Sequence, residues 1–559
     1  MVKVGKLMSC SKQLCFAYVL QLAAVDKLYK KNIEREEEQQ EITYNESDTD
    51  DKDTYDTKEN NNRIVTTTGH RHLHISRIEL IPTYNDLLHK LCVGAWRTFS
   101  SKVTKEPYWI AKFPDRIASF DEIPTVTEKY NPRKVPEVAE GWFKKYGHVV
   151  KEPMQYGKYN VHLFHFDDFR TVYRSDGDFP IRQSHYVIAQ YRQERKNLYD
   201  HVGLGPGQGT EWRHLRDIAR GKAFALRPSK EKSEDAVDDL VEIIKSNLND
   251  KGEIELLPWL HRWAFESIGI VALNRRLNAL AKSNNELADK MVEASALTDE
   301  IIALTTMDPT TMYDERYKQL VEAQDFFYSV LRKYIDDIKR DIELEPESDG
   351  VAQVLFQSGS CTENDAITLI MDLFHGSLQT VPLTALMAFY HVARHGGIQA
   401  EAREEAKQRM PKKDSRYFDG TEPVDYTQSI VYETLRLNPP IIGNGRVIQK
   451  DLVLGGYSVP AYTNVLLHFQ VACRQEENYK EPLKFIPERA DPSRITYVFG
   501  GSNRMCLGKA FAMRQLFLVV AKVIRNFEIS YDGDEISMIN QMHNKPEKPL
   551  ILRLKPIDE

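Results

Sequence analysis

A loop rich in small residues leads into an apolar helix near the end of the chain, and it restricts the fold more than any other segment. The loop covers residues 497–508 and places Cys506 directly before a predicted helix at 509–525. Backbone N–H groups at a helix N-terminus favour a thiolate over a thiol. Gly500 and Gly501 lack Cβ atoms, so the backbone can approach a flat ligand closely. The segment predicts either a thiolate site for a planar iron cofactor or a glycine-rich turn around a buried cysteine.

Three further residues of this loop bear on the ligand hypothesis. Phe499 can shield the sulfur from water, and Arg504 is placed to meet an acidic group at the ligand's edge. Gly508 permits close approach on the other side of the cysteine.

A second motif lies upstream, at the end of another predicted helix. Glu433 and Arg436 are three residues apart and so share one helical face. Prolines follow the helix directly, and the run Phe485–Arg489 comes after them. An arginine can join two carboxylate or carbonyl partners in a fixed fork. Glu433, Arg436 and Arg489 are therefore predicted to form a buried lock, with an ordinary surface ion pair as the alternative.

The order of these motifs resembles that of the cytochrome P450 family of haem-thiolate enzymes. The three motifs are ExxR at Glu433–Arg436, FxPER at Phe485–Arg489 and FGxxxRxCxG at Phe499–Gly508. In the last motif Ser502 stands where the family usually has glycine, which implies a backbone angle that serine tolerates poorly. The resemblance implies a mainly α fold with small β-sheets in one large haem domain. It also implies haem b, iron protoporphyrin IX, as the cofactor, with the Cys506 thiolate as the axial ligand of the iron.

The hydrophobic pattern agrees with mostly helix and a few short strands. The expected elements are helices at 136–146 and 509–525, a largely helical region up to about 394, strands near 148–151, 160–166 and 447–467, and a strand at 527–531 before a hairpin-like tail. Residues 1–105 lack a sustained amphipathic period. We therefore expect an N-terminal extension at 1–105, disordered or used for targeting, ahead of the haem domain at 106–559.

Further cofactor residues follow from the resemblance. Trp212 and Arg216 match a Trp-x-x-x-Arg helix whose two side chains meet a haem propionate in the family. Arg446 and Arg504 resemble the remaining propionate partners. An indole N–H and guanidinium forks are donors suited to carboxylates.

The helix that handles oxygen in the family is expected from about Thr362 to Arg394. Thr362 and Asp365 form a predicted capping box at its start. Pro382 cannot donate a hydrogen bond to the carbonyl of Leu378, so we expect the helix to open or kink there.

This helix departs from the family pattern where protons are handled. Gly376 is kept, but Leu378 and Gln379 stand where the family has an acid and a threonine, and Thr380 follows one residue later. Monooxygenation consumes protons, which an acid–alcohol pair usually relays. Gly376, Gln379 and Thr380 are therefore the candidate catalytic residues, with ordered water as another carrier of protons.

Two kinds of reaction remain open at this point. The resemblance implies a monooxygenase that hydroxylates an apolar substrate, with sterols and steroids as the first class to consider. The missing acid makes a haem-thiolate isomerase or dehydratase, which needs no O2, the alternative. A haem-binding protein with little catalysis is a third hypothesis.

Charge and composition limit the partners. The chain of 559 residues has 75 basic and 82 acidic residues, and this weak acidic excess argues against nucleic-acid binding. Residues 34–60 hold twelve acids and three bases, so the rest of the chain is nearly neutral and can accept an acidic electron donor. No stretch reaches the length of a membrane span, which leaves peripheral membrane contact open.

The compartment is predicted from the leader. Residues 63–105 carry seven basic and two acidic residues with many hydroxyl groups, and 97–100 resembles an organelle-peptidase cleavage site. This favours a mitochondrial enzyme on the matrix side of the inner membrane that takes electrons from a ferredoxin-type donor. Gln428 and Tyr432 stand where that branch often has lysines, although Lys509 and Arg514 remain on the expected docking side. The endoplasmic reticulum with a microsomal reductase is the alternative.

Overall fold

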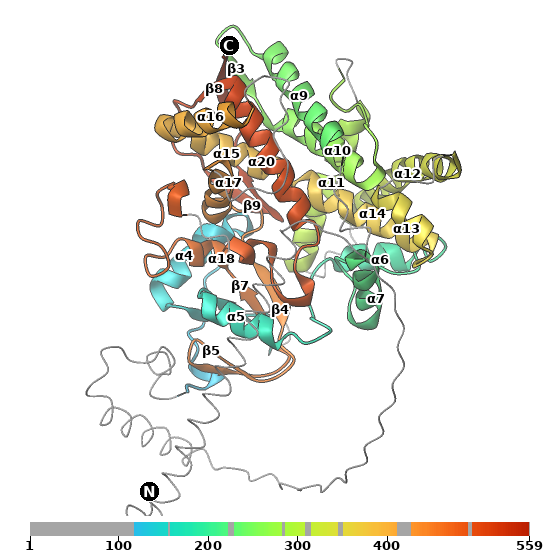
Figure 1. The fold of residues 1–559 in the computed structure, drawn as a ribbon. Helices are drawn as coiled ribbons and strands as arrows, with labels where there is room; N and C mark the ends of the chain where they lie inside the picture. The colour runs from blue at the N-terminus through green and yellow to red at the C-terminus, as the bar shows by residue number, and fades with distance from the viewer. Residues whose placement is uncertain are drawn as a thin grey trace, which may run out of the picture. The chain divides into compact units, whose positions relative to one another are not determined.

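A long apolar helix near the C-terminus organises the core. In this computed structural model α20 (Lys509–Asn526) buries most of its length. It packs against α9 (Lys230–Asn247) and against α15, α16 and α17. Figure 1 shows α20 in red, with α9 and α10 on one side and α15 to α17 on the other. The predicted helix at 509–525 is confirmed.

The structure describes residues 117–154, 157–221, 229–281, 286–307, 315–344, 350–410, 426–489 and 495–557. The described residues from Ala118 onward belong to one unit. The predicted extension at 1–105 and the predicted start of the haem domain at 106 lie outside the described residues. Among the described helices, none combines the length and the apolarity that crossing a bilayer requires.

Helices form most of the described chain, as predicted. The remaining α-helices are α4 (Val135–Tyr146), α5 (Phe166–Ser175), α6 (Tyr186–Gln193), α7 (Gly209–Arg220), α10 (Leu257–Leu273), α11 (Glu286–Met307), α12 (Glu315–Leu344), α13 (Val351–Ser358), α14 (Glu363–Leu378), α15 (Thr380–Arg394), α16 (Gly396–Arg409), α17 (Tyr426–Leu437) and α18 (Phe469–Cys473). Short 3₁₀ turns are η1 (Phe120–Glu122), η2 (Pro132–Lys134), η5 (Pro487–Arg489), η6 (Thr496–Phe499) and η7 (Ser502–Arg504).

Small sheets complete the fold. The largest has the order β1-β2-β7-β4, in which only the β2–β7 pair is parallel. Its strands are β1 (Val149–Pro153), β2 (Tyr159–Leu163), β7 (Asn464–Leu467) and β4 (Asn444–Val447). The others are the hairpin β5 (Leu452–Leu454) with β6 (Tyr457–Val459), the sheet β3 (Glu253–Glu255), β11 (Ile551–Pro556) and β8 (Phe527–Ser530), and the hairpin β9 (Met538–Gln541) with β10 (His543–Pro546).

The helix expected from Thr362 to Arg394 is two helices. α14 ends at Leu378 and α15 begins at Thr380, with Gln379 between them at φ −107° and ψ −40°. Pro382 lies in the first turn of α15, where a missing N–H costs least. The expected opening is therefore confirmed, and it is confined to Gln379, whose backbone stays in the right-handed helical region.

The capping box at the start of α14 is half formed. Thr362 Oγ1 accepts the N–H of Asp365 at 3.1 Å, as predicted. The Asp365 carboxylate does not return to the backbone of Thr362, because it lies 2.7 Å from His201 Nδ1 instead. The box prediction was therefore wrong for its second bond, since a tertiary partner competes for that side chain.

The predicted lock residues meet behind the cysteine loop. Arg436 donates to both carboxylate oxygens of Glu433, at 2.7 and 2.8 Å, and neither side chain is exposed. Arg489 Nε lies 3.4 Å from the same carboxylate. Arg436 also donates to the backbone carbonyls of Cys473, Pro482 and Lys484. These bonds tie α17 to the segment between α18 and the cysteine loop.

Candidate functional site

Cys506 closes the loop that precedes α20. Its N–H donates to the carbonyl of Phe499 at 2.8 Å, which folds the loop back on itself. Burial raises the pKa of the Cys506 thiol, whereas the backbone N–H groups of Gly508 and Lys509 and the charge of Arg216 lower it. The Cys506 side chain is nevertheless exposed. The sulfur therefore faces an open space although it lies deep among protein groups, as an axial ligand must.

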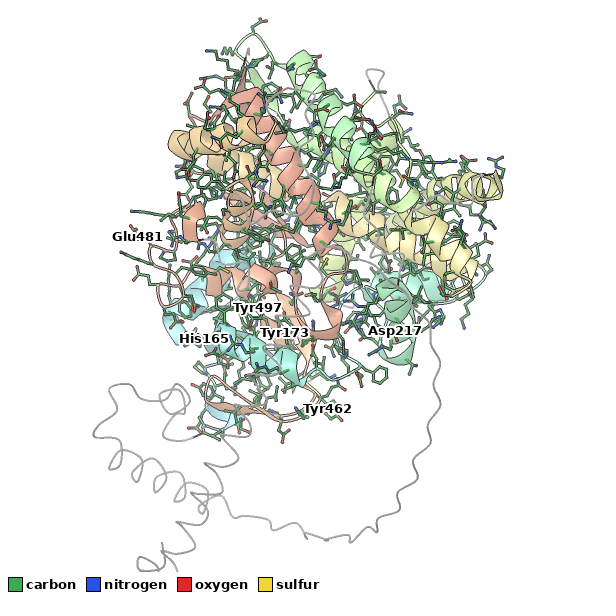
Figure 2. The ribbon with its side chains drawn as sticks, viewed as in Figure 1. His165, Tyr173, Asp217, Tyr462, Glu481 and Tyr497 are labelled. Atoms are coloured by element: carbon green, nitrogen blue, oxygen red, sulfur yellow. The ribbon has the colours of Figure 1, made fainter. Side chains whose placement is uncertain are left out.

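Aromatic packing fixes the shape of this loop. The rings of Tyr173 and Tyr497 stack with their centroids 6.1 Å apart and lie together in Figure 2. A Cβ at Gly501 would come within 2.5 Å of the Tyr173 ring, so only glycine fits there. Ser502 has φ +58°, which confirms the strained backbone expected of it. Its hydroxyl donates to the Asp176 carboxylate, a bond that glycine would lack.

The helix break sorts the candidate catalytic residues into two groups. Gly376 is exposed, and a Cβ added to it would meet nothing within 4 Å. Thr380 is half-buried, and its Oγ1 donates to the carbonyl of Gly376 at 2.7 Å. Leu378 is fully buried in the packing behind them. Thr380 therefore brings a hydroxyl beside the open space at Gly376, one residue later than the family pattern.

Gln379 points elsewhere. Its side chain is buried, its Nε2 donates to the carbonyl of Val292 at 3.4 Å, and it hydrogen-bonds His261. The sequence analysis names both Gln379 and Thr380 as candidate proton carriers, but the placement of the Gln379 side chain favours Thr380.

Two predicted propionate partners come from α7 and the cysteine loop. Arg216 donates to the carbonyl of Met505 at 2.6 Å, and its Nε has no hydrogen-bond partner. Arg504 donates to Gln208 Oε1 at 3.0 Å and lies over the buried Trp212 ring, 4.8 Å from its centroid. Burial lowers the pKa of Arg216 to about 10, and burial together with Arg182 lowers that of Arg504 to about 8. Among the described residues, neither guanidinium donates a hydrogen bond to a carboxylate.

Arg446 and a residue that carries no motif complete this cationic cluster. Arg446 on β4 donates to Asp176 Oδ2 at 2.8 Å and to the carbonyl of Gly501 at 3.2 Å. Arg182 donates to the carbonyl of Gly205 at 2.6 Å, but its Nε has no partner. Burial lowers the pKa of Arg182 to about 10, with Arg446 adding to the effect. The sequence analysis missed Arg182, which stands alone in a loop.

The cationic cluster, Arg182, Arg216, Arg446 and Arg504, fits an anionic cofactor. Among the hydrogen bonds of the described residues, these four side chains reach one carboxylate, that of Asp176. The two orphaned Nε atoms and the lowered pKa values indicate a site that a dicarboxylate would complete. Haem b carries two propionates, so the donor set and the exposed sulfur both match it.

A second polar group beside Gly376 was also missed. His375 Nδ1 lies 3.1 Å from Ser295 Oγ, and Asp299 lies 3.8 Å from His375 and 3.4 Å from His543. Burial raises the pKa of Asp299 well above its usual range and lowers those of His375 and His543 to about 4 and about 3. Burial therefore disfavours the charged form of all three side chains. Its members come from α11, α14 and β10, so no local motif reveals it.

The contact between Gly501 and Tyr173 generates a prediction. We expect Gly501→Ala to displace the cysteine loop and destabilise the protein by about 1–3 kcal/mol, the usual cost of overpacking. Thermal unfolding and the haem content of the purified protein measure the effect. Tyr173→Leu combined with Gly501→Ala should recover part of the loss, because the clash is with that ring.

Gly397→Ala on α16 is the matched control. Gly397 has nothing within 4 Å of its added Cβ, so this variant should be as stable as the wild type. Equal stability and haem content in the Gly501 and Gly397 variants would show that the loop does not depend on this contact.

Comparison with known proteins agrees with the geometry. The family model for cytochrome P450 matches residues 126–554. Cytochrome P450 302a1, mitochondrial, of Drosophila melanogaster is 25% identical over 445 residues, which cover 76% of this chain and 90% of the relative. Probable cytochrome P450 12a5, mitochondrial, of the same species is 26% identical over 81% of this chain and 94% of the relative. Probable cytochrome P450 12b2, mitochondrial, is 28% identical over 69% of this chain and 78% of the relative.

Proposed function

The chain belongs to the cytochrome P450 family, and from this premise we propose that it is a monooxygenase with Cys506 as its haem ligand. Members of the family bind haem b through a cysteine thiolate. The observation that carries the proposal is the exposed Cys506 sulfur at the N-terminus of α20, with the cationic cluster around the same loop. When bound, haem supplies the redox chemistry that transfers an oxygen atom from O2, which thiolate ligation promotes.

The chain's own residues have three tasks around the cofactor. The N–H groups of Gly508 and Lys509 stabilise the Cys506 thiolate. The cationic cluster and Trp212 hold the propionates, while Phe499 shields the sulfur. Thr380 Oγ1 holds a proton beside Gly376 and can pass it to a group in the open space there.

The substrate we propose is apolar with a neutral polar substituent. The apolar part follows from the family resemblance, and sterols and steroids are the first class to test. The substituent follows from Asp299, His375 and His543, because among the described residues His375 Nε2 has no hydrogen-bond partner and burial disfavours the charged form of all three side chains. A hydroxyl or carbonyl satisfies such donors and acceptors without burying a charge.

The mitochondrion is the proposed compartment, with the enzyme on the matrix side of the inner membrane. The names of three relatives call those proteins mitochondrial, and the basic leader of this chain supports the same organelle. A ferredoxin-type protein is the proposed electron donor. The endoplasmic reticulum and a microsomal reductase remain the alternative to be tested.

One observation favours a second reaction class. Leu378 replaces the usual acid and is fully buried, and Gln379 bonds away from Gly376. A haem-thiolate isomerase or dehydratase needs neither this acid nor an electron donor. The second candidate is therefore rearrangement or dehydration of an oxidised lipid such as a hydroperoxide.

Reconstitution of the purified holoenzyme separates these functions. Ligands that shift the Soret band are selected first and then incubated with ferredoxin, its reductase and NADPH, or with a microsomal reductase and NADPH. We expect oxygen consumption and a hydroxylated product with the ferredoxin system. Turnover of lipid hydroperoxides without any reductase, and no product with either reductase, would contradict the monooxygenase and favour the second candidate.

Thr380→Ala tests the proton route in the same assay. Removing the hydroxyl should lower the amount of product formed per NADPH by about a hundredfold, because a positioned proton donor accelerates many reactions by about that factor or more. Gln379→Ala should change this ratio little, because its side chain bonds to Val292 and His261.

Thr368→Ala is the matched control for helix packing. Thr368 makes the same bond to a carbonyl four residues back, but two turns before Gly376. An equal loss in the Thr380 and Thr368 variants would assign the effect to packing, and a larger loss in the Gln379 variant would overturn the choice of Thr380.

A further inference from the structure

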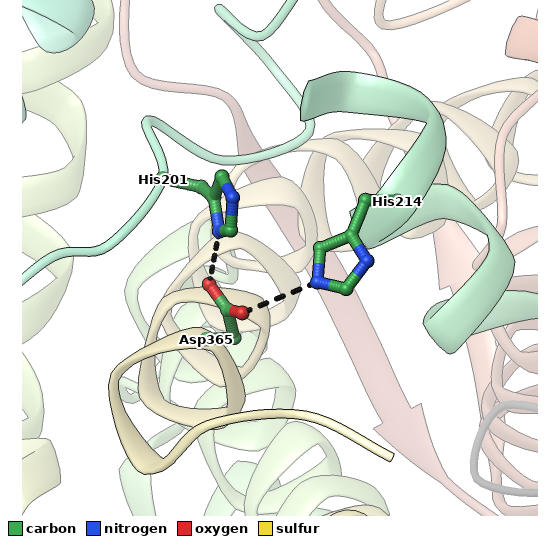
Figure 3. Close-up of side chains that lie close together, drawn as sticks. All are labelled: His201, His214 and Asp365. Carbon is green, nitrogen blue, oxygen red and sulfur yellow. Dashed lines mark hydrogen bonds and ion pairs between the residues drawn. The ribbon is translucent and has the colours of Figure 1, made fainter. Parts of the chain in front are cut away.

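A histidine–carboxylate cluster lies between α7 and the start of α14, outside the site described above. His201 precedes α7, His214 is on α7, and Asp365 is in the first turn of α14. His201 Nδ1 is 2.7 Å from Asp365 Oδ1, and His214 Nε2 is 3.5 Å from Asp365 Oδ2 (Figure 3). One ligand atom from each residue lies within 4.8 Å of the other two. The three side chains thus converge on one point.

The Asp365 carboxylate is the unusual member of this cluster. Its side chain is 1% exposed, and its Oδ2 has no hydrogen-bond partner. His201 accounts for Oδ1 alone, so a simple His–Asp pair leaves half of a buried carboxylate unsatisfied. Such a group normally costs stability unless an ion or a donor completes it. The free oxygen is directed toward His214, which is itself half exposed, so a cation can enter from solvent.

Neighbouring bonds hold the ligands in place. Asp200 accepts hydrogen bonds from Thr362 Oγ1 at 2.6 Å and Asn364 Nδ2 at 2.9 Å, which docks the His201 backbone on α14. The N–H of Val202 donates to Glu211 Oε1 at 2.6 Å, which ties the same loop to α7. The cluster is therefore built on two helices and a clamped loop, the preorganisation that metal sites require.

The donor set selects the metal. Two imidazole nitrogens and one carboxylate oxygen suit Zn²⁺, which binds such ligands at about 2.0–2.2 Å and leaves a fourth position for water. Ca²⁺ and Mg²⁺ prefer oxygen ligands throughout. We propose that His201, His214 and Asp365 form a zinc site that clamps α7 to α14. α7 carries Trp212 and Arg216 and α14 carries Gly376, so the clamp joins two walls of the cofactor site.

Zinc titration of the haem-loaded protein tests this site. A chelator first removes any bound zinc from the holoenzyme while the haem stays in place. The protein is then titrated with Zn²⁺ by calorimetry, and its unfolding temperature is measured with and without zinc. We expect one saturable site and a higher unfolding temperature with zinc. His214→Ala should weaken binding at least about tenfold and abolish the shift, because one of three ligands is lost. Its partly exposed side chain makes this variant safe for folding.

His148→Ala is the matched control. His148 forms an exposed pair with Glu477 at 3.5 Å and does not belong to the cluster of His201, His214 and Asp365, so its loss should leave zinc binding unchanged. Zinc-edge X-ray absorption of the wild type should show nitrogen and oxygen neighbours only. Absence of saturable binding, equal affinity in the His214→Ala variant, or a sulfur neighbour that places zinc on a cysteine would each overturn the proposal.

Discussion

Burial of positive charge around one sulfur is the constraint on which this structure depends. Arg182, Arg216, Arg446 and Arg504 gather beside the cysteine loop, and Asp176 is the carboxylate that their hydrogen bonds reach. Burying unpaired guanidiniums is costly, and the lowered pKa values of three of them record that cost. An anionic cofactor offsets this cost, so haem binding stabilises the fold of this region electrostatically.

The candidate proton-handling residues lie at the helix break around Gln379. Leu378 and Gln379, which replace the usual acid and threonine, are buried, and Thr380 donates to the carbonyl of Gly376. His375, the residue before Gly376, joins Asp299 and His543 in one buried polar group. The chain thus keeps a hydroxyl beside Gly376 while Leu378 takes the place of the acid.

Local motifs predicted the features that are local in the chain. The positions of Cys506, of the Glu433–Arg436 pair with Arg489 and of the helix at 509–525 follow from short patterns and hydrophobic periodicity. The sequence did not reveal Arg182, the Asp299 group or the cluster around Asp365, since each is assembled from segments far apart in the chain. The second half of the Thr362 capping box failed for the same reason, because His201 competes for Asp365.

The central claim is that Cys506 supplies the thiolate on which the cationic cluster and the cysteine loop converge. The absorption spectrum of the reduced protein with carbon monoxide tests it most directly, because the Soret position of that complex depends on the axial ligand. We expect the red-shifted band of a thiolate-ligated haem in the wild type and in Cys473→Ala, and its loss in Cys506→Ala. A band that persists in the Cys506→Ala variant would contradict the account.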